Sequence, residues 1–298
     1  MARFRKTANP AKQAQSVEKA LQRGKHIRSV RTLNNYRERL ERVATKLPEY
    51  GVRSEIRDLD RAGISHYLEH RSHEVGQKTL DMERQALQAM ARYVTHAIEE
   101  KETLPVTKSD HEQALTGRAY TTEQVAMVAN AQTDKHSLST EIAYAAGLRA
   151  SELHNLLPVA ERGADERPAL ESKFEGRDGE RYTVIGKGGL VREITLPRDL
   201  AERLEERRLD TPVQITDRGV HYQQNYAIGA GQPWSNSFSR ASNRVLEWSA
   251  GAHGVRHSYA QERMDELQNA GNSEAIAKET VSQELGHFRA DITDTYLR

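Results

Sequence analysis

The sequence predicts a mainly α fold with a small β-sheet (α+β), divided into two domains. The chain has 298 residues, a length at which about two domains are expected. Apolar residues recur every three or four positions over long stretches, which is typical of amphipathic helices. Residues 182–196 instead have β-branched residues on either side of a glycine-rich centre, which is typical of a β-hairpin.

The composition favours a cytoplasmic protein. Charged residues make up 29% of the chain and apolar residues 37%, which indicates a heavily solvated surface. No run approaches the roughly 18 apolar residues needed to cross a bilayer, and no signal-peptide pattern opens the chain. Because the chain has no cysteine, disulfides, thiolate metal sites and cysteine nucleophiles are excluded.

Positive charge is concentrated at the beginning of the chain. Residues 1–31 hold nine Lys or Arg and one acid, Glu18, so they carry +8 although the whole chain carries only +1. Such a segment often contacts a polyanion, because each neutralised phosphate releases counterions. A solubilising disordered tail would have the same charge, and charge alone does not separate the two interpretations. We expect residues 1–28 to form a basic flexible arm.

A small helical bundle is expected over residues 29–104. Its first helix has an apolar face formed by Leu33, Tyr36, Leu40, Val43 and Leu47. Pro48 and Gly51 end this helix. Further helical patterns cover about residues 58–73 and 79–98, and three or four short helices suffice for a bundle.

Residues 105–117 have the charge, proline and glycine of a linker, and residues 118–298 form the second domain. A helix is expected to begin at Thr121, with Gln124 completing a capping box. The next helix is expected from Gly147 to about Leu157, ended by Pro158. The hairpin at 182–196 follows. Helical patterns then return after residue 198, around 236–248 and over 253–270.

Six residues of this second domain suit chemistry at a phosphodiester: Arg149, Lys187, His253, Arg256, His287 and Tyr296. An arginine fork bonds two phosphate oxygens and keeps its charge at any working pH. Two forks would offset the charge of a pentacoordinate transition state. Lys187, at the hairpin tip, would protonate a leaving oxygen.

Spacing predicts how some of these side chains are held. His253 and Arg256 are three positions apart, so a helix would present both on nearly one face. Arg149 and Glu152 share that spacing, so the carboxylate is expected to hold the guanidinium.

Tyr296 is the candidate nucleophile. A free phenol has a pKa of about 10, so it needs cationic neighbours or a base. Asp291 is expected to cap a short final helix, with Asp294 in its first turn, on a movable segment. Tyr259, the nearest other phenol, is expected in the core, and His257 is expected beneath the site.

The local motifs resemble those of the tyrosine recombinase (phage integrase) family. Gly-Leu-Arg-Ala-Ser-Glu-Leu at 147–153 resembles the family's first arginine box, and His-Gly-Val-Arg-His-Ser-Tyr-Ala at 253–260 resembles its second. Leu285-Gly286-His287, with Tyr296 nine positions after the histidine, resembles its terminal box. The resemblance covers roughly residues 118–298. It implies a tyrosine-recombinase catalytic domain preceded, at 29–104, by a helical core-type DNA-binding domain.

The resemblance also implies a reaction. Tyr296 would attack the scissile phosphate, giving a 3′-phosphotyrosine and a free 5′-hydroxyl. Arg149, Arg256 and His287 would stabilise the phosphorane, Lys187 would act as general acid, and His253 would assist proton transfer. Because the covalent link keeps the bond energy, no cofactor, ATP or metal is expected.

The implied partner is double-stranded DNA with specific recombination sites, clamped between the two domains in the bacterial nucleoid. Four protomers would exchange strands through a Holliday junction, with accessory DNA-bending or directionality proteins as further partners. The basic arm favours an integrase of a mobile element over a dimer resolvase. Only Leu297 and Arg298 follow Tyr296, whereas many relatives continue into a helix that docks on the next protomer. Either protomers couple by another route or the sequence is cut short.

Three other functions fit parts of the sequence. His66-Tyr-Leu-Glu-His70 matches the zinc-binding motif of inverzincin proteases, but no partner acidic motif is evident and the six-residue set would be left unexplained, so a polar helix face is the favoured interpretation. A non-catalytic DNA-binding protein would have kept the fold without the chemistry. A type IB topoisomerase would use related phosphotyrosine chemistry without a site requirement.

Overall fold

The computed structural model describes residues 8–112 and 116–298. The chain divides into two compact units, Met1–Ala114 (unit 1) and Leu115–Arg298 (unit 2), and the division falls within the stretch expected to be a linker. Within the described ranges, no helix combines the length and apolar character that a bilayer crossing requires.

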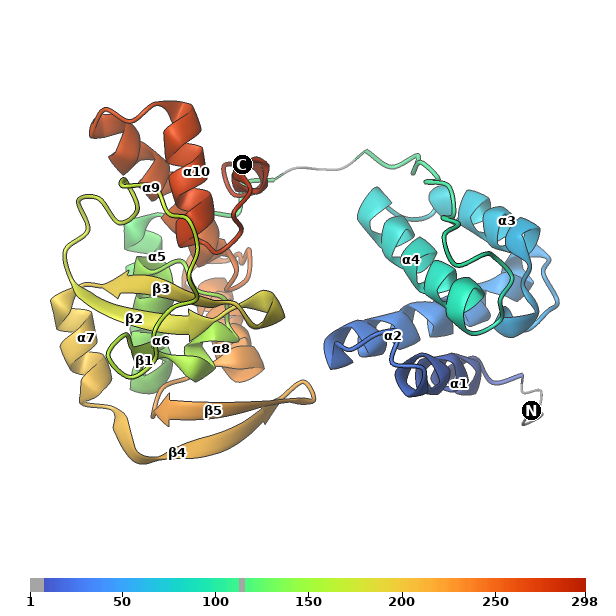
Figure 1. Cartoon of the computed structure of the whole chain (residues 1–298), viewed down its shortest axis with the longest axis horizontal. Helices are drawn as coiled ribbons and strands as arrows, with labels where there is room; N and C mark the ends of the chain where they lie inside the picture. The colour runs from blue at the N-terminus through green and yellow to red at the C-terminus, as the bar shows by residue number, and fades with distance from the viewer. Residues whose placement is uncertain (1–7, 113–115) are drawn as a thin grey trace. The chain divides into compact units, whose positions relative to one another are not determined.

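The described part of unit 1 is a bundle of four α-helices: α1 (Pro10–Arg23), α2 (Val30–Lys46), α3 (Arg61–Ser72) and α4 (Gln77–Tyr93) (Figure 1). Two short 3₁₀ helices, Leu47–Tyr50 and Ile56–Asp58, connect α2 to α3. The stripe predicted for α2 is its buried face, with Leu33, Leu40 and Val43 in the core. Gly51, at φ +77°, follows the 3₁₀ turn as expected for a helix stop.

The expectation of a flexible arm over residues 1–28 is wrong for the described part of that segment. Asn9 accepts a hydrogen bond from the backbone of Lys12 at 3.1 Å, Pro10 occupies the first turn, and α1 follows. Val17 and Leu21 are fully buried against the rest of the bundle. The apolar stripe of α1 is weak in the sequence, because it is short and its buried residues include small Ala14 and polar Gln13. Residues 1–7 lie outside the described residues.

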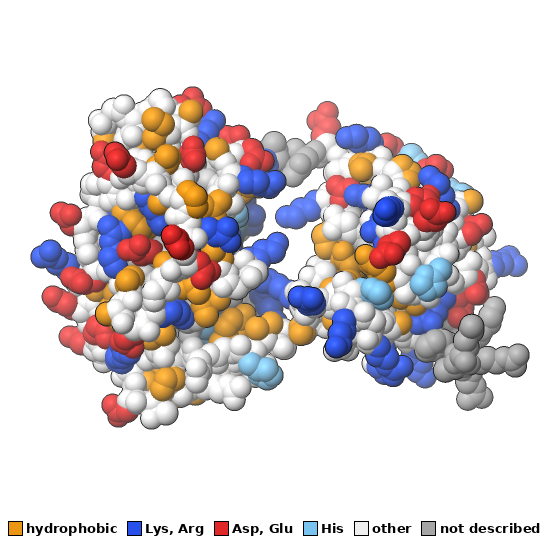
Figure 2. All heavy atoms as spheres, viewed as in Figure 1, with side chains coloured by type: hydrophobic (Ala, Val, Ile, Leu, Met, Phe, Trp, Pro, Cys, Tyr) orange, Lys and Arg blue, Asp and Glu red, His pale blue; other side chains and the backbone are white. Residues whose placement is uncertain are grey.

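The basic residues of this segment occupy the other face of α1. Lys12, Lys19 and Arg23 are exposed on the helix, and Lys25 and Arg28 are exposed after it. Figure 2 shows Lys and Arg side chains gathered over this part of unit 1. The positive charge of the first 31 residues is therefore displayed, at least in the described part, on a folded surface.

Unit 2 has two antiparallel sheets among its helices (Figure 1). The first sheet has the order β1-β2-β3, formed by β1 (Leu157–Pro158), β2 (Glu180–Ile185) and β3 (Val191–Leu196). Tyr182 pairs with Ile194 and Val184 with Arg192. The predicted hairpin is confirmed, and the short 3₁₀ turn Lys187–Gly189 joins its strands.

The helices of unit 2 are α5 (Thr122–Asn130), α6 (Asp134–Ala145), α7 (Arg198–Glu205), α8 (Gly231–Leu246), α9 (Gly254–Asn269) and α10 (Glu274–Glu284). The capping box of Thr121 and Gln124 is confirmed at the start of α5. One hydrophobic core lies among α5, α6, α8 and the first sheet, and a second joins α9, α10 and the C-terminal segment.

Two parts of unit 2 differ from expectation. The helix expected over 147–157 is absent, because Gly147, at φ +59°, ends α6, and only a 3₁₀ turn, η3 (Glu152–Asn155), follows. The second sheet, β4 (Arg208–Asp217) with β5 (Val220–Tyr226), was not predicted. β4 is exposed along most of its length, so its sequence lacks the apolar alternation of a half-buried strand.

Candidate active site

Five of the six predicted side chains lie together in unit 2, around the phenol of Tyr296. The Tyr296 hydroxyl is 3.0 Å from His287 Nε2 and 3.3 Å from Arg256 Nε. Arg149 Nη2 lies 3.1 Å from the same histidine nitrogen, and Arg256 Nη2 lies 3.2 Å from it. The His253 ring centroid is 5.8 Å from that of Tyr296. The phenol therefore contacts one guanidinium group and one imidazole, with a second guanidinium group on that imidazole and the His253 ring nearby.

Two helix ends deliver Arg149 and His287 to this point. α6 ends at Gly147, and the Leu148 amide donates back to Ala143 O at 2.9 Å. α10 ends in the same manner: Gly286 has φ +73°, and the His287 amide donates to Ser282 O at 2.9 Å. This reversal, the Schellman motif, needs a left-handed residue and therefore favours glycine. The two glycines thus have a structural role beside the functional residues.

Arg256 fastens the two turns to each other. Its side chain is fully buried on α9, where Nη1 donates to Gly147 O and Nη2 donates to Leu285 O. A Cβ on Gly147 would come within 2.8 Å of the Leu285 side chain, so the turns also meet in van der Waals contact. One arginine therefore holds the backbone on both sides of the site while its Nε faces Tyr296.

Glu152 balances the positive charge of the site. Its carboxylate accepts from Arg149 Nη1 at 2.7 Å and from Arg192 Nη2 at 2.8 Å, and lies 3.9 Å from Arg256 Nη1. The expected contact between Glu152 and Arg149 is confirmed, although a turn and not a helix brings them together. Burial alone would raise the pKa of Glu152, but the charges of Arg192, Arg256 and Arg149 outweigh it and lower the pKa to about 2.

Arg192 was not among the predicted site residues. A strand arginine is ordinarily exposed, yet Arg192 is 4% exposed and faces the same side of β3 as Ile194 and Leu196. Its place in the two-residue alternation, in line with two core residues, was the signal available in the sequence.

The histidines of the site are held in the neutral form. Burial, together with Arg256 and Arg149, lowers the pKa of His287 to about 4. Burial and the charge of Arg118 lower the pKa of His257, whose ring packs 5.0 Å from that of Tyr296, as expected of a residue beneath the site. Because guanidinium groups only donate, His287 Nε2 must accept, and its ring proton lies on Nδ1. The nitrogen that faces the phenol is therefore unprotonated at neutral pH.

The segment carrying Tyr296 is docked on α10 and α9. It forms a 3₁₀ helix, η5 (Ala290–Thr295), in which Thr293 Oγ1 donates to Lys278 O at 2.9 Å. Gln261 Nε2 donates to Tyr296 O at 3.0 Å, and the Tyr296 side chain is 5% exposed. The predicted cap is wrong: the N-cap residue is Arg289, Asp291 lies within the helix, and no side-chain cap forms. The expected movable segment is fixed here by these contacts.

Lys187 is the predicted residue that the structure does not bring to the phenol. It is exposed in the turn between β2 and β3, and within the described residues no contact joins it to the other five. The turn nevertheless begins beside the site, since a Cβ on Gly186 would lie 3.4 Å from Glu152 Oε1. Tyr259, by contrast, lies in the core as predicted, and its hydroxyl donates to Glu284 at 2.8 Å.

The two histidines of the zinc-binding alternative, His66 and His70 of unit 1, make other contacts. His66 Nε2 lies 3.1 Å from Tyr50 O, and the His70 ring stacks on the Tyr50 ring at 5.2 Å. Across the described residues, no group of three or more His, Asp or Glu side chains is placed to hold a metal ion. These histidines pack one face of α3 against the turn after α2.

Comparison with known proteins identifies the fold. No protein-family profile matches the chain, and no curated protein is similar to it in sequence. A lambda integrase dimer bound to a COC′ core site is 16% identical with a TM-score of 0.61, over 96% of this chain and 76% of that one. The XerH recombinase bound to a palindromic difH substrate is 18% identical with a TM-score of 0.55, over 89% and 76%. The Tn1549 transposon integrase in complex with circular intermediate DNA is 16% identical with a TM-score of 0.54, over 96% and 95%. The chain has the tyrosine recombinase fold.

Proposed function

We propose that this protein is a site-specific DNA recombinase that cuts and rejoins strands through a 3′-phosphotyrosine on Tyr296. One observation carries the proposal: the Tyr296 hydroxyl lies 3.0 Å from His287 Nε2 and 3.3 Å from Arg256 Nε, with Arg149 Nη2 on the same histidine. A phenol used only for packing would not need a guanidinium group and a neutral imidazole at its oxygen, with a second guanidinium group on that imidazole. These groups are the ones that activate a phenol and stabilise a phosphorane.

The chemical step follows from these positions. The Tyr296 oxygen bonds to phosphorus as the bond from phosphorus to the 5′ oxygen breaks. The phenol proton passes to His287 Nε2, and the leaving 5′ oxygen takes a proton from Lys187. Arg149, Arg256 and the newly protonated His287 stabilise the non-bridging oxygens, while His253 assists proton transfer. Attack by a 5′-hydroxyl on the phosphotyrosine reverses the step, so no nucleotide hydrolysis is required.

The partner is double-stranded DNA carrying specific sites. Among the similar structures, lambda integrase is described as a dimer on a core site and as a tetramer on a Holliday junction. For this chain we infer the same arrangement, four protomers on two DNA sites. The exposed basic face of α1 supplies part of the phosphate contact, because neutralised phosphates release counterions. Integration or excision of a mobile element is the biological role that we propose.

Trapping the covalent complex tests the proposal. The full chain is incubated with sheared genomic DNA and denatured, and the DNA attached to protein is sequenced. We expect attached 3′ ends at a small number of sequences and a phosphorylated Tyr296 peptide by mass spectrometry. Tyr296→Phe should abolish the adduct, a loss of at least about 10³-fold, because no other nucleophile replaces the phenol.

Tyr222→Phe is the matched control. Tyr222 is a half-buried phenol of the same unit, and its ring stacks on His154, a contact that phenylalanine keeps. This variant should form the adduct at the rate of the unchanged chain. Adduct formation by Tyr296→Phe, or attachment through another tyrosine, would refute the proposal. Relaxation of supercoiled DNA without any sequence preference would assign the chain to the topoisomerases instead.

A further inference from the structure

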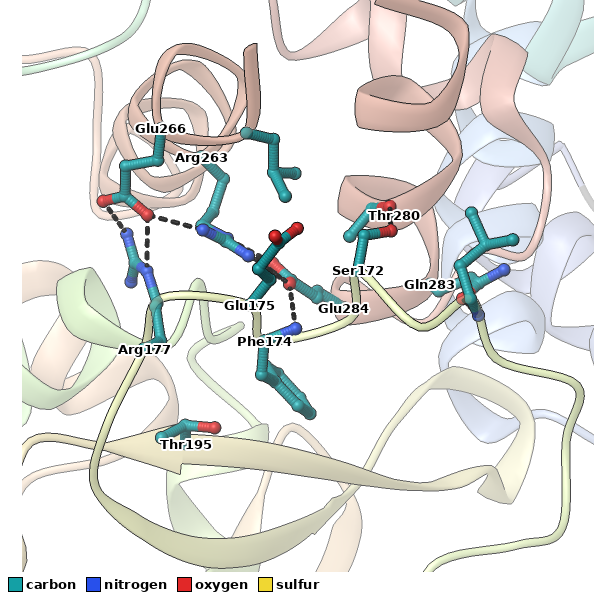
Figure 3. A network of polar contacts seen from close by, with 12 residues as sticks. Ser172, Phe174, Glu175, Arg177, Thr195, Arg263, Glu266, Thr280, Gln283 and Glu284 are labelled. Carbon is teal, nitrogen blue, oxygen red and sulfur yellow. Dashed lines mark hydrogen bonds and ion pairs between the residues drawn. The ribbon is translucent and has the colours of Figure 1, made fainter. Parts of the chain in front are cut away.

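The long loop between β1 and β2, residues 159–179, is fastened to α10. Loops beyond about 12–15 residues without secondary structure are uncommon and are usually functional. Its contacts follow the helix: the Leu170 amide donates to Gln283 Oε1 at 2.9 Å, and Ser172 Oγ lies 2.6 Å from Thr280 Oγ1 (Figure 3). The Phe174 amide then donates to Glu284 Oε1 at 2.8 Å. Three residues of the loop therefore contact the second half of α10, and the last of them binds a buried carboxylate.

Glu284 is the centre of a polar network that the proposed reaction does not use. Its side chain is fully buried, and it accepts from Arg263 Nε and Nη2, each at 3.0 Å, and from Phe174 N (Figure 3). It also accepts from the Tyr259 hydroxyl at 2.8 Å. A charge is tolerated in the interior when it is paired and its lone pairs are occupied. Both oxygens of Glu284 are engaged, so α9 and the loop fix the position of this residue.

The backbone that follows Glu284 runs directly into the active site. Glu284 O accepts from Arg192 Nη1 at 2.6 Å, and Leu285 O accepts from Arg256 Nη2. Gly286 makes the left-handed turn, and His287 then places Nε2 beside the Tyr296 phenol. Only two residues separate the buried carboxylate from His287, and the carbonyl of the first, Leu285, is held by Arg256.

We propose that Glu284 is a positioning residue for His287: anchored by Arg263, Tyr259 and the 159–179 loop, it fixes the end of α10 from which His287 reaches Arg149, Arg256 and Tyr296. The effect on catalysis rests on the proposed function. The effect on the position of His287 does not, because it concerns the protein without DNA.

The first test measures the position of His287 without DNA. Burial and the charges of Arg256, Arg149 and Arg192 lower the pKa of His287 to about 4, against a smaller opposite effect of Glu152. NMR titration of the histidine ring signals, assigned with His287→Asn, follows that pKa. The double variant Arg263→Met, Glu284→Met leaves no lone buried charge. In this variant His287 should move away from the arginines and become less buried, so its pKa should rise toward 6.5. Glu284→Gln, which can still accept from Phe174 N and Tyr259, should show a smaller rise.

The second test uses the DNA fragment recovered by covalent trapping. The rate of adduct formation should fall about 10- to 100-fold in the double variant, because a misplacement of about 1 Å can cost 10²-fold. The Kd for the fragment, measured by fluorescence anisotropy, should stay within about twofold, since no phosphate contact is removed. A fall in rate without a change in Kd separates positioning from general loss of structure.

Glu266→Gln is the matched control. Glu266 pairs with Arg263 at 2.7 Å and with Arg177 at 2.7 Å in the same network (Figure 3). Its side chain is 45% exposed, and among the described residues no ion pair joins it to α10. It should change neither the pKa of His287 nor the rate. A folded double variant with an unchanged His287 pKa would overturn the proposal. If the unchanged chain forms no adduct, the proposed function fails, while the titration still decides the role of Glu284.

Discussion

Glu152 and Glu284 are two carboxylates of unit 2 that are almost completely buried, 0% and 1% exposed, yet they are paired with positive charge in different ways. Glu152 is shared by arginines of three separate segments, Arg149 after α6, Arg192 on β3 and Arg256 on α9. Glu284 has one arginine, Arg263, which keeps a second carboxylate in Glu266. The first is the common counter-ion of the site, and the second is a local anchor behind it.

This difference predicts which of the two carboxylates is more costly to remove. Among the ion pairs of the described residues, Arg149, Arg192 and Arg256 have no acidic partner except Glu152. Removing that one carboxylate leaves two buried guanidinium groups, Arg192 and Arg256, without a counter-charge. Removing Glu284 leaves Arg263 with Glu266. Although both are buried acids, we expect unequal consequences.

Among the substitutions that test this comparison, Glu152→Gln is expected to reduce the free energy of unfolding most. Unpairing buried charges costs about 3–5 kcal/mol, and the displaced Arg149 and Arg256 should slow adduct formation by about 10²-fold. Glu284→Gln should cost clearly less free energy of unfolding, because Arg263 retains a partner. Urea unfolding of the two variants measures the comparison. Equal losses would mean that the number of arginines around a carboxylate does not matter here.

An intermediate effect is expected on acid stability. The folded-state pKa of Glu152, about 2, is below its ordinary 4.5, so its contribution to stability is complete above pH 4.5 and is lost as the pH falls toward 2. The midpoint of thermal unfolding should therefore fall over this range, and Glu152→Gln should flatten that part of the curve. His287→Asn is the comparison variant. The pKa of His287 is lowered from 6.5 to about 4, so burial of this neutral ring costs stability as the pH falls from 6.5 to about 4. His287→Asn should therefore change the curve in this higher pH range and leave the range of Glu152 unchanged.

The smallest effect is expected from glycine substitutions at two equivalent helix ends. Gly286 ends α10 and Gly271, at φ +96°, ends α9 with the same backbone reversal, Asn272 N to Leu267 O at 3.0 Å. Alanine at a left-handed position costs about 1–2 kcal/mol. At Gly271 nothing lies within 4 Å of the added Cβ, but at Gly286 it would meet Arg192 Cδ at 2.7 Å.

Gly286→Ala should therefore lose more stability than Gly271→Ala, and it alone should slow adduct formation, since Arg192 binds both Glu152 and Glu284 O. Urea unfolding and the trapping assay measure both variants. Equal behaviour of the two would show that Arg192 adapts without disturbing the site.

Much of the candidate site could be predicted from the sequence because its residues lie in short local motifs. Gly147 and Gly286, in Gly-Leu-Arg and Leu-Gly-His, each take the left-handed conformation that ends a helix just before Arg149 and His287. The motifs were recognised as local patterns, although Gly147 was expected to begin a helix. The spacing of Arg149 and Glu152 was sufficient to predict their contact. The hairpin was predictable for the same reason, because its alternation and its glycines are local.

The features that were missed depend on partners far away in the chain. The apolar stripe of α1 is stabilised by the packing of Val17 and Leu21 on the other helices of unit 1, which local sequence does not show. Arg192 is an ordinary strand residue until Glu152 meets it across the fold. The helix expected at 147–157 is absent because Gly147 takes the left-handed conformation at the end of α6, where Arg256 of α9 holds its carbonyl.

The sequence by itself determined which residues were candidates for the chemistry and where the hairpin and several helices of their domain lie, since periodicity, glycine and capping act within a few residues. Only the tertiary structure decided that Tyr296 is docked and not free, that Glu152 balances three arginines, and that Lys187 stands apart from the other five. The physical reason is burial. A charge or phenol acquires its properties from the groups that replace water around it, and folding brings those groups from positions more than 100 residues apart.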